Sequence, residues 1–202
     1  MSKLYFSYSA MNAGKSTSLL QVAHNYGERD METVLFTAAL DTRKGAATIA
    51  SRVGIEKPAE TFSDNTDMYT CLKNILDTKS IAAVLIDEAQ WLTREQVWQL
   101  AKFVDTHKIP VMCYGLRTDF KGELFPGSET LLAIADELRE IRTICRCGRK
   151  ACMTLRYDSS GKAVAVGPQN QVGGNESYES VCRRHWTEAL EKAGPASTQN
   201  EA

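Results

Sequence analysis

The chain has no excess of charge of either sign. Its 202 residues include 24 Lys and Arg and 25 Asp and Glu, which leave a formal net charge of −1. A protein that binds nucleic acid mainly by neutralising phosphates needs a basic excess, so the composition argues against that class. We therefore expect no nucleic-acid partner. A small phosphate-containing ligand held at one local site fits the composition better.

The sequence also lacks an apolar run long enough to cross a bilayer, and its first residues lack the pattern of a secretory signal. We expect no membrane partner and a cytoplasmic location. Because disulfides are rare in that compartment, the six cysteines are expected to be thiols or metal ligands. The length suits one domain, or one domain with a small appendage.

A candidate phosphate-binding loop lies near the start of the chain, between an apolar run and a helix-like stretch. In such loops, backbone N–H groups hold phosphate oxygens, a lysine meets the outer phosphates and a hydroxyl binds Mg²⁺. The helix N-terminus adds a partial positive charge. The pattern differs from Gly-x₄-Gly-Lys-Ser only at its first position; the alternative is a strand-to-helix turn without a ligand. Its residues are Ser9, Ala10, Met11, Asn12, Ala13, Gly14, Lys15 and Ser16.

The first 144 residues have the pattern of an α/β fold, a parallel sheet with helices on both faces. Segment 38–61 lacks periodicity and is expected to be a mobile surface loop, either a contact segment or a plain connector. In that loop Arg43 could meet a phosphate, although a solvated arginine is the commoner case. Strands are expected at 4–8, 33–37, 82–87 and 110–116, helices at 15–29, 66–78 and 93–107, and a shorter element at 128–137.

Two adjacent carboxylates, Asp87 and Glu88, follow the most apolar of the expected strands. A strand that is apolar on both faces is central, and ligands of open α/β sheets bind at the carboxyl ends of the strands. We expect Asp87 to hold Mg²⁺ opposite Ser16, and Glu88 to take a proton from the nucleophile. That nucleophile is water in an ATPase and a hydroxyl in a kinase, and these residues do not separate the two. The alternative is a solvated strand end that caps the next helix.

Four potential metal ligands follow a change of composition near residue 145. Cys145, Cys147, Cys182 and His185 form two close pairs, which is typical of a structural Zn²⁺ site without an open position. Cys152 is an alternative ligand, and reduced, partly buried thiols are the alternative to a metal. We expect a core at 1–144, a zinc-binding appendage at 145–192 and a disordered tail at 193–202.

In the same order along the chain, several segments resemble those of the type II thymidine kinases. They are the loop 9–16, DEAQW at 87–91, YGLRTDF at 114–120, the Cys145 and Cys147 pair, GGNESY at 173–178 and CRRH at 182–185. The resemblance covers nearly the whole chain. It implies ATP-dependent phosphorylation of the 5′-hydroxyl of thymidine, and also of deoxyuridine. It further implies a core similar to the recombinase-type ATPases, with a zinc-pinned lasso that closes over the nucleoside.

The resemblance also assigns roles by position. Glu88 would be the base, Lys15, Ser16 and Asp87 would manage ATP with Mg²⁺, and Gln90 would belong to the nucleotide-binding segment. Aromatic rings offer flat surfaces to a pyrimidine, although ordinary core packing is the alternative reading of each. Trp91 replaces the usual phenylalanine, and Gln171 stands where an apolar residue is common. The residues implied to contact the nucleoside are Trp91, Leu116, Phe120, Phe125, Thr154, Gln169, Asn170, Gln171, Val172, Gly173 and Tyr178.

Two other functions compete with this reading. One is a nucleic-acid-stimulated ATPase whose zinc appendage binds DNA, which the near-neutral charge disfavours. The other is a regulatory nucleotide-binding protein that uses slow hydrolysis as a switch. The resemblance, for its part, implies a homotetramer and feedback inhibition by dTTP.

Overall fold

The computed structural model describes residues 2–40, 47–169 and 177–193. They belong to two compact units. The first comprises Met1–Ser9, Gly14–Arg117 and Phe125–Ile141, and the second comprises Ala10–Ala13, Thr118–Leu124 and Arg142–Ala202. The domain boundaries expected from the sequence, 1–144, 145–192 and 193–202, stay predictions.

The sheet of the first unit has six parallel strands in the order β5-β2-β6-β7-β1-β8. Every residue of β6 is buried, as expected for a central strand covered on both faces. Four of the strands confirm the four that the sequence predicts. The strands are β1 (Leu4–Ser9), β2 (Thr33–Ala38), β5 (Glu60–Phe62), β6 (Ala83–Ile86), β7 (Val111–Leu116) and β8 (Glu137–Glu140).

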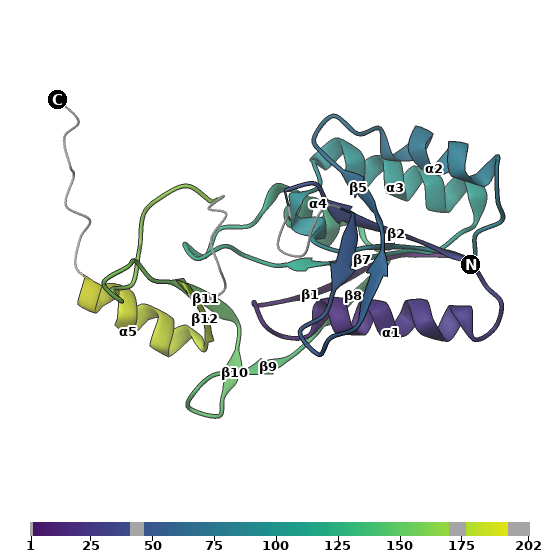
Figure 1. Cartoon of the computed structure of the whole chain (residues 1–202). Helices are drawn as coiled ribbons and strands as arrows, with labels where there is room; N and C mark the ends of the chain where they lie inside the picture. Colours follow the sequence, from purple (N-terminus) through teal and green to yellow (C-terminus); the bar gives the residue numbers. More distant parts are fainter. Residues whose placement is uncertain (1, 41–46, 170–176, 194–202) are drawn as a thin grey trace. The chain divides into compact units, whose positions relative to one another are not determined.

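Helices cover both faces of this sheet, which confirms the predicted fold class (Figure 1). On one face α1 (Lys15–Gly27) buries Leu19, Leu20 and Ala23 against the sheet. The other face carries α2 (Met68–Leu76), α3 (Arg94–His107) and α4 (Pro126–Ile134), whose apolar side chains join the larger core. The expected helix at 93–107 begins with a capping box between Thr93 and Gln96.

The expectation of a structureless loop at 38–61 is wrong for its second half. β3 (Thr48–Ala50) and β4 (Glu56–Pro58) form an antiparallel hairpin, and β5 begins at Glu60. Ile49 is the buried residue of β3 and packs with the α1 core. One buried residue in a three-residue strand leaves too short a pattern to detect. Arg43 lies outside the described residues.

The expectation for 128–137 is right for a helix but misses the strand that follows it. α4 ends at Ile134, and β8 then pairs with β1 as an edge strand. Its sequence, ELRE, is mostly charged, and Glu137 pairs with Lys3 at 2.6 Å. Charged edge strands resist pairing with other chains, and the same charges hide the strand from a search for apolar alternation.

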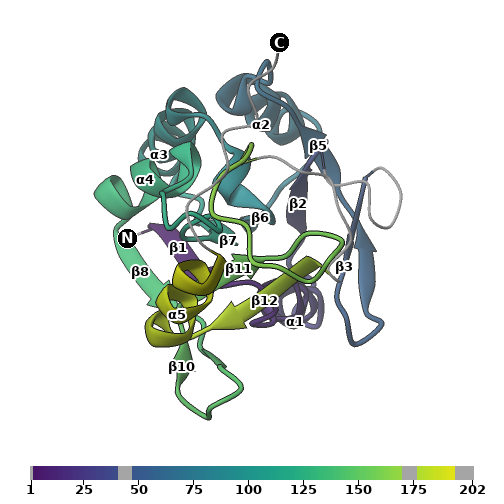
Figure 2. The same cartoon turned by 90° about the vertical axis from the view of Figure 1, so that its left-hand side faces the viewer.

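The described residues of the second unit form short strands and one helix. β9 (Thr143–Ile144) pairs with β10 (Lys150–Ala151), and β11 (Met153–Arg156) pairs with β12 (Tyr178–Val181), both antiparallel. Figure 2 shows α5 (Arg183–Ala193) alongside β11 and β12. Its small core contains Cys145, Ala151, Leu155, Val181 and Cys182, with Trp186 and Leu190 of α5 packed against them.

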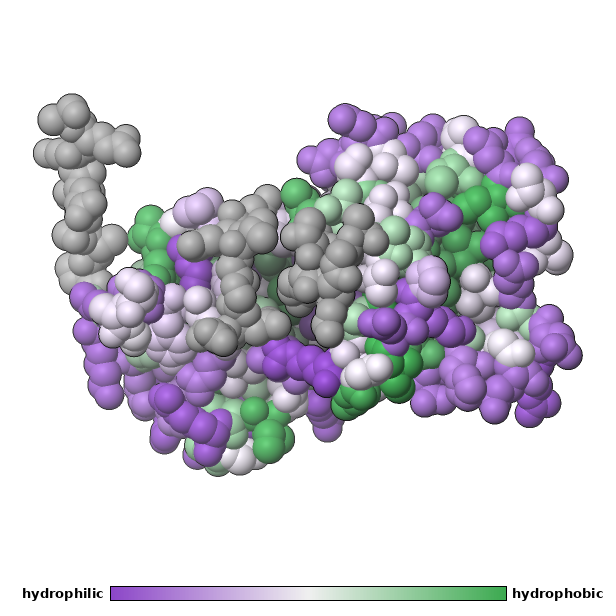
Figure 3. All heavy atoms as spheres, viewed as in Figure 1, coloured by the Kyte–Doolittle hydropathy of each residue, from purple (hydrophilic) through white to green (hydrophobic). Residues whose placement is uncertain are grey.

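Hydrophilic residues gather along the outer sides of α1 and α2 on the face drawn in Figure 3, and hydrophobic residues appear between the two helix layers. This distribution is that of a sheet buried between solvated helices. In the described part of the chain, no helix combines the length and the apolar character that a membrane crossing requires.

Candidate active site and metal centre

The candidate phosphate loop joins the end of β1 to the start of α1. Nζ of Lys15 donates to Oγ of Ser9 at 3.0 Å, and both residues are buried. Oγ of Ser16 donates to Oδ2 of Asp87 at 2.7 Å, so the loop hydroxyl meets the carboxylate at the end of β6. A hydroxyl and a carboxylate side by side are oxygen ligands of the kind that Mg²⁺ prefers, so these residues fit the ion expected with ATP.

The middle of the loop, Ala10–Ala13, belongs to the second unit. There the Ser180 hydroxyl of β12 donates to the backbone carbonyl of Met11. Asn12 has a φ of 59°, in the left-handed region. A side-chain bond to this loop fixes the backbone whose N–H groups would meet phosphate.

Asp87 lies in an environment that disfavours its charge. Burial and the neighbouring Glu88 carboxylate raise the pKa of Asp87 to about 6. Hydrogen bonds from Ser16 and from the Glu88 N–H, together with the charge of Lys15, lower the pKa but do not outweigh this effect. An ionised carboxylate there costs free energy until a cation arrives. A cation bound at this site would therefore relieve the cost of the buried negative charge on Asp87.

The cost of ionising Asp87 predicts that Asp87→Asn stabilises the zinc-loaded protein in the absence of nucleotide. The folded pKa lies above the unfolded value near 3.8, so ionisation destabilises the fold above about pH 6 and has no effect below about pH 4. We expect the free energy of unfolding, measured by urea denaturation, to rise by about 1–3 kcal/mol at pH 8 and to be unchanged at pH 4. Asp105→Asn on the exposed side of α3 is the matched control. Equal or lower stability of Asp87→Asn at pH 8 would contradict the assignment.

Glu88 and Gln90 form a second polar pair of the first unit. Glu88 has a φ of 53°, an uncommon conformation for a residue other than glycine and one that clusters at functional sites. Nε2 of Gln90 donates to Oε2 of Glu88, while Oε1 of Gln90 accepts from the Leu116 N–H at 3.0 Å. A Cβ at Gly115 would lie 2.9 Å from the backbone N of Gln90, so glycine makes this approach possible. Gln90 therefore links the Glu88 carboxylate to the end of β7.

Two aromatic residues proposed for the nucleoside also meet in the first unit. The rings of Trp91 and Phe125 pack edge to face, with centroids 5.0 Å apart. Phe125 is buried and Trp91 is half-buried. An aromatic pair with one partly exposed ring offers an apolar surface to a ligand.

Other candidate nucleoside residues lie in the second unit. Phe120 and Thr154 are buried, and Oγ1 of Thr154 has no hydrogen-bond partner among the described residues. A buried hydroxyl without a partner is costly, and a ligand atom could satisfy it. Tyr178 begins β12, and Nε2 of Gln169 donates to Oδ2 of Asp119 at 3.1 Å. Asn170, Gln171, Val172 and Gly173 lie outside the described residues.

The four predicted zinc ligands come together in the second unit. Their ligand atoms all lie within 4.8 Å of one another. Sγ of Cys147 is 3.8 Å from Sγ of Cys182, and Sγ of Cys145 is 3.1 Å from Nδ1 of His185. Tetrahedral zinc with Zn–S bonds of about 2.3 Å separates two sulfurs by roughly 3.8 Å. The residues therefore fit zinc, and the cluster of four does not include Cys152.

The Cys145 thiol is prepared for a metal. Burial raises its pKa, but backbone N–H groups of Cys147 and Cys182 and the His185 ring outweigh burial and lower the pKa to about 6. Thiolates, not thiols, bind zinc. The two hydrogen-bonding N–H groups belong to the ligand pairs themselves, so the local backbone builds the site.

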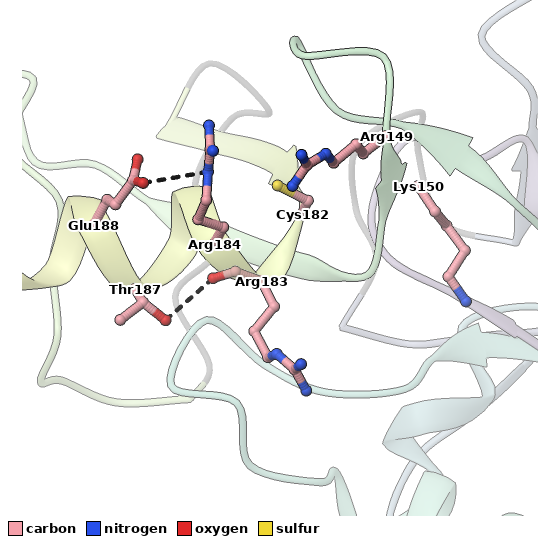
Figure 4. A pocket seen from close by; sticks show the side chains of 7 residues that line it. All are labelled: Arg149, Lys150, Cys182, Arg183, Arg184, Thr187 and Glu188. Carbon is pink, nitrogen blue, oxygen red and sulfur yellow. Dashed lines mark hydrogen bonds and ion pairs between the residues drawn. The ribbon is translucent and has the colours of Figure 1, made fainter.

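A hollow of about 530 Å³ is lined in part by Cys182, a member of the candidate metal cluster (Figure 4). Figure 4 shows its cationic side chains pointing in different directions, and Arg184 pairs with Glu188 at 3.3 Å. Three thiolates with one bound Zn²⁺ would carry a net charge of about −1, and cations in the neighbourhood of such a cluster are favourable. The cations that line the hollow are Arg149, Lys150, Arg183 and Arg184.

No sequence motif assigns a role to three residues that organise the second unit. Ser180 holds the phosphate loop, Asp119 accepts the backbone N–H groups of Lys121 and Glu123, and Arg156 stacks on Phe120. Asp119 lies inside the segment YGLRTDF at 114–120, so its position in a family motif could have indicated a role. Arg156, two residues after Thr154 on a short strand, had no comparable signal.

Comparison with known proteins agrees with this geometry. The family model for thymidine kinases matches residues 2–186. A thymidine kinase of Ruegeria pomeroyi is 57% identical over 194 residues, 96% of this chain and 98% of the relative. One of Agrobacterium fabrum is 58% identical over 94% of this chain and 98% of the relative, and one of Salmonella typhimurium is 53% identical over 98% and 97%. This chain belongs to the thymidine kinase family.

Proposed function

We propose that the chain transfers the γ-phosphate of ATP to the 5′-hydroxyl of thymidine, and also of deoxyuridine, to give the nucleoside monophosphate and ADP. The observation that carries the proposal is the contact between the Ser16 hydroxyl and the Asp87 carboxylate, with Lys15 in the same loop. Residues 9–16 and Gln90 would bind the triphosphate. Mg²⁺ bound with ATP neutralises charge on the phosphates.

Glu88 is the proposed general base. Its carboxylate takes the proton of the 5′-hydroxyl while the oxygen forms a bond to the γ-phosphorus and the bond to ADP breaks. Gln90 donates to this carboxylate and holds its orientation. Such transfer depends on positioning and charge neutralisation more than on covalent chemistry, which suits a phosphate loop with one carboxylate base.

Two groups of residues are proposed to contact the nucleoside. Trp91, Leu116 and Phe125 supply apolar surface in the first, and Phe120, Thr154 and Tyr178 contribute from the second. The segment 169–173 is proposed to read the base through its backbone, which tolerates polar side chains such as Gln171. Zinc at Cys145, Cys147, Cys182 and His185 would have a structural role, since four protein ligands leave no open position.

Three further features follow from family membership and are part of the proposal. The protein acts in the cytoplasm in nucleoside salvage for DNA synthesis, it assembles as a homotetramer, and dTTP inhibits it by occupying both substrate regions. No nucleic acid or membrane is required.

An assay of labelled ATP tests this function against the competing ones. We expect transfer of label to thymidine, with one ADP formed for each thymidine monophosphate and about one zinc bound per chain. Single-stranded DNA in place of nucleoside is the control and should leave ATP turnover unchanged. Turnover stimulated by DNA and not by thymidine would favour an ATPase, and slow turnover indifferent to both would favour a regulatory switch.

A further inference from the structure

The second unit buries one positive charge at a meeting point of three chain segments. Of the described arginines, Arg156 alone is buried, with 5% of its surface exposed. Its guanidinium lies 3.8 Å from the centroid of the Phe120 ring. Nη1 donates to the Pro168 carbonyl at 3.0 Å, and Nη2 reaches the Val166 carbonyl at 3.5 Å. Burying a guanidinium is costly, so these carbonyls and the ring must offset its desolvation.

The residues around this guanidinium are shaped to it. A Cβ at Gly167 would lie 2.3 Å from Nη2 of Arg156, and the φ of Gly167 is 146°. A side chain at 167 would therefore both strain the backbone and displace the guanidinium. Asp119, next to Phe120 in sequence, accepts from Gln169 and from two N–H groups of its own turn. One hydrogen bond, from Gln169 to Asp119, thus ties the turn 118–124 to the segment 164–169, and Arg156 bridges the two through the Phe120 ring and the Pro168 carbonyl.

Arg156 also lies on the functional face of the β11–β12 ribbon. Alternate residues of a strand share a face, so Thr154 and Arg156 lie on the same face of the ribbon. Their cross-strand neighbours on β12, Ser180 and Tyr178, lie on that face too. The Ser180 hydroxyl donates to the Met11 carbonyl, and the buried Thr154 hydroxyl has no partner within the described parts of the chain.

The other face of the ribbon packs into the small core of the second unit. Leu155 and Val181 are fully buried there in the small core, next to Trp186 of α5. Tyr157 continues this side, where its hydroxyl donates to Oε2 of Glu179 at 2.6 Å. One face stabilises the unit, and the other gathers the residues that would meet substrate.

We propose that Arg156 is a positioning residue for the nucleoside. Its guanidinium holds the Phe120 ring and the chain at 166–168 in place, so that the surface for the pyrimidine is formed before substrate arrives. This inference rests on the proposed function in one respect, the assignment of Phe120, Thr154 and Tyr178 to nucleoside binding. Preformed sites bind more tightly because less ordering is left to be done on binding.

The kinetic test compares Arg156→Met and Arg156→Lys in the full-length, zinc-loaded protein. We expect Arg156→Met to raise the KM for thymidine about 30-fold or more, and the KM for ATP by less than about 2-fold. Arg156→Lys keeps the charge but loses the planar fork, so its thymidine KM should rise about 5- to 10-fold. Tyr157→Phe removes a hydrogen bond on the opposite face and is the matched control, with both KM values within about 2-fold of the parent.

Hydrogen exchange separates this proposal from the proposed function. In Arg156→Met, amides of 118–124 and 164–169 should exchange faster while the bound zinc is unchanged, whether or not thymidine is the substrate. An unchanged thymidine KM in this variant would overturn the proposal, as would equal increases for thymidine and ATP. Parent-like behaviour of Arg156→Lys would also overturn it, because the charge alone would then suffice. If Arg156→Met fails to fold, the lysine variant decides by the same criteria.

Discussion

Glu88→Gln is expected to lower kcat for thymidine phosphorylation by about 10²–10⁴-fold, the range typical of the loss of a general base. Glutamine has the same shape and still accepts the hydrogen bond that Gln90 donates, but it cannot take a proton. The left-handed backbone at position 88 is unaffected by the exchange of a carboxylate for an amide. The loss should therefore appear in kcat, measured by release of ADP and formation of the monophosphate.

Binding measurements distinguish a lost base from a damaged site. The affinity for ATP with Mg²⁺, measured by calorimetry, should stay within about 3-fold of the parent, because Lys15, Ser16 and Asp87 are intact. Glu95→Gln, on the exposed side of α3, controls for loss of one negative charge from the first unit. A Glu88→Gln enzyme that kept a tenth or more of its turnover would show that another group accepts the proton.

Much of the first unit follows from local pattern. Residues 83–86 are apolar on both faces, which predicts a central strand, and in parallel sheets a residue just after such a strand lies at the ligand-binding edge. That rule, together with the strand-to-helix position of the loop, was enough to bring Ser16 and Asp87 together. Their contact at 2.7 Å is what the pattern predicts.

The pattern fails where a strand depends on its neighbours more than on its own residues. β8 is a charged edge strand held by pairing with β1, and β3 contributes a single buried residue to the α1 core. Neither has the alternation that marks a half-buried strand. Their existence is decided by tertiary packing, which short sequence windows do not contain.

The parts of the candidate site that depend on the spacing of residues along the sequence were predictable, and the parts that depend on burial were not. Two close pairs of cysteine and histidine predicted the metal cluster, because ligand geometry limits the spacing. Arg156 reads as an ordinary charged residue on a short strand. Its burial is set by Phe120, Val166 and Pro168, which reach it only in the folded chain.

Loss of a zinc ligand should be the other severe change. The core of the second unit is small, and its buried members include two of the ligands themselves, Cys145 and Cys182. Structural zinc contributes on the order of 10 kcal/mol to the folding of small domains, more than so few apolar contacts can replace. We expect Cys182→Ser to reduce bound zinc from about one per chain to near zero and to abolish thymidine phosphorylation.

The same experiment decides whether Cys152 is a ligand. Cys152→Ser is the matched control, and it should keep its zinc and most of its activity, because the cluster is complete without Cys152. Far-UV circular dichroism should show that Cys182→Ser retains the helices of the first unit, whose core is larger and lies away from the ligands in sequence. If Cys152→Ser lost zinc as fully as Cys182→Ser, the ligand set would be wrong. If Cys182→Ser kept full activity without zinc, the metal would not be needed to keep Phe120, Thr154 and Tyr178 in the arrangement that activity requires.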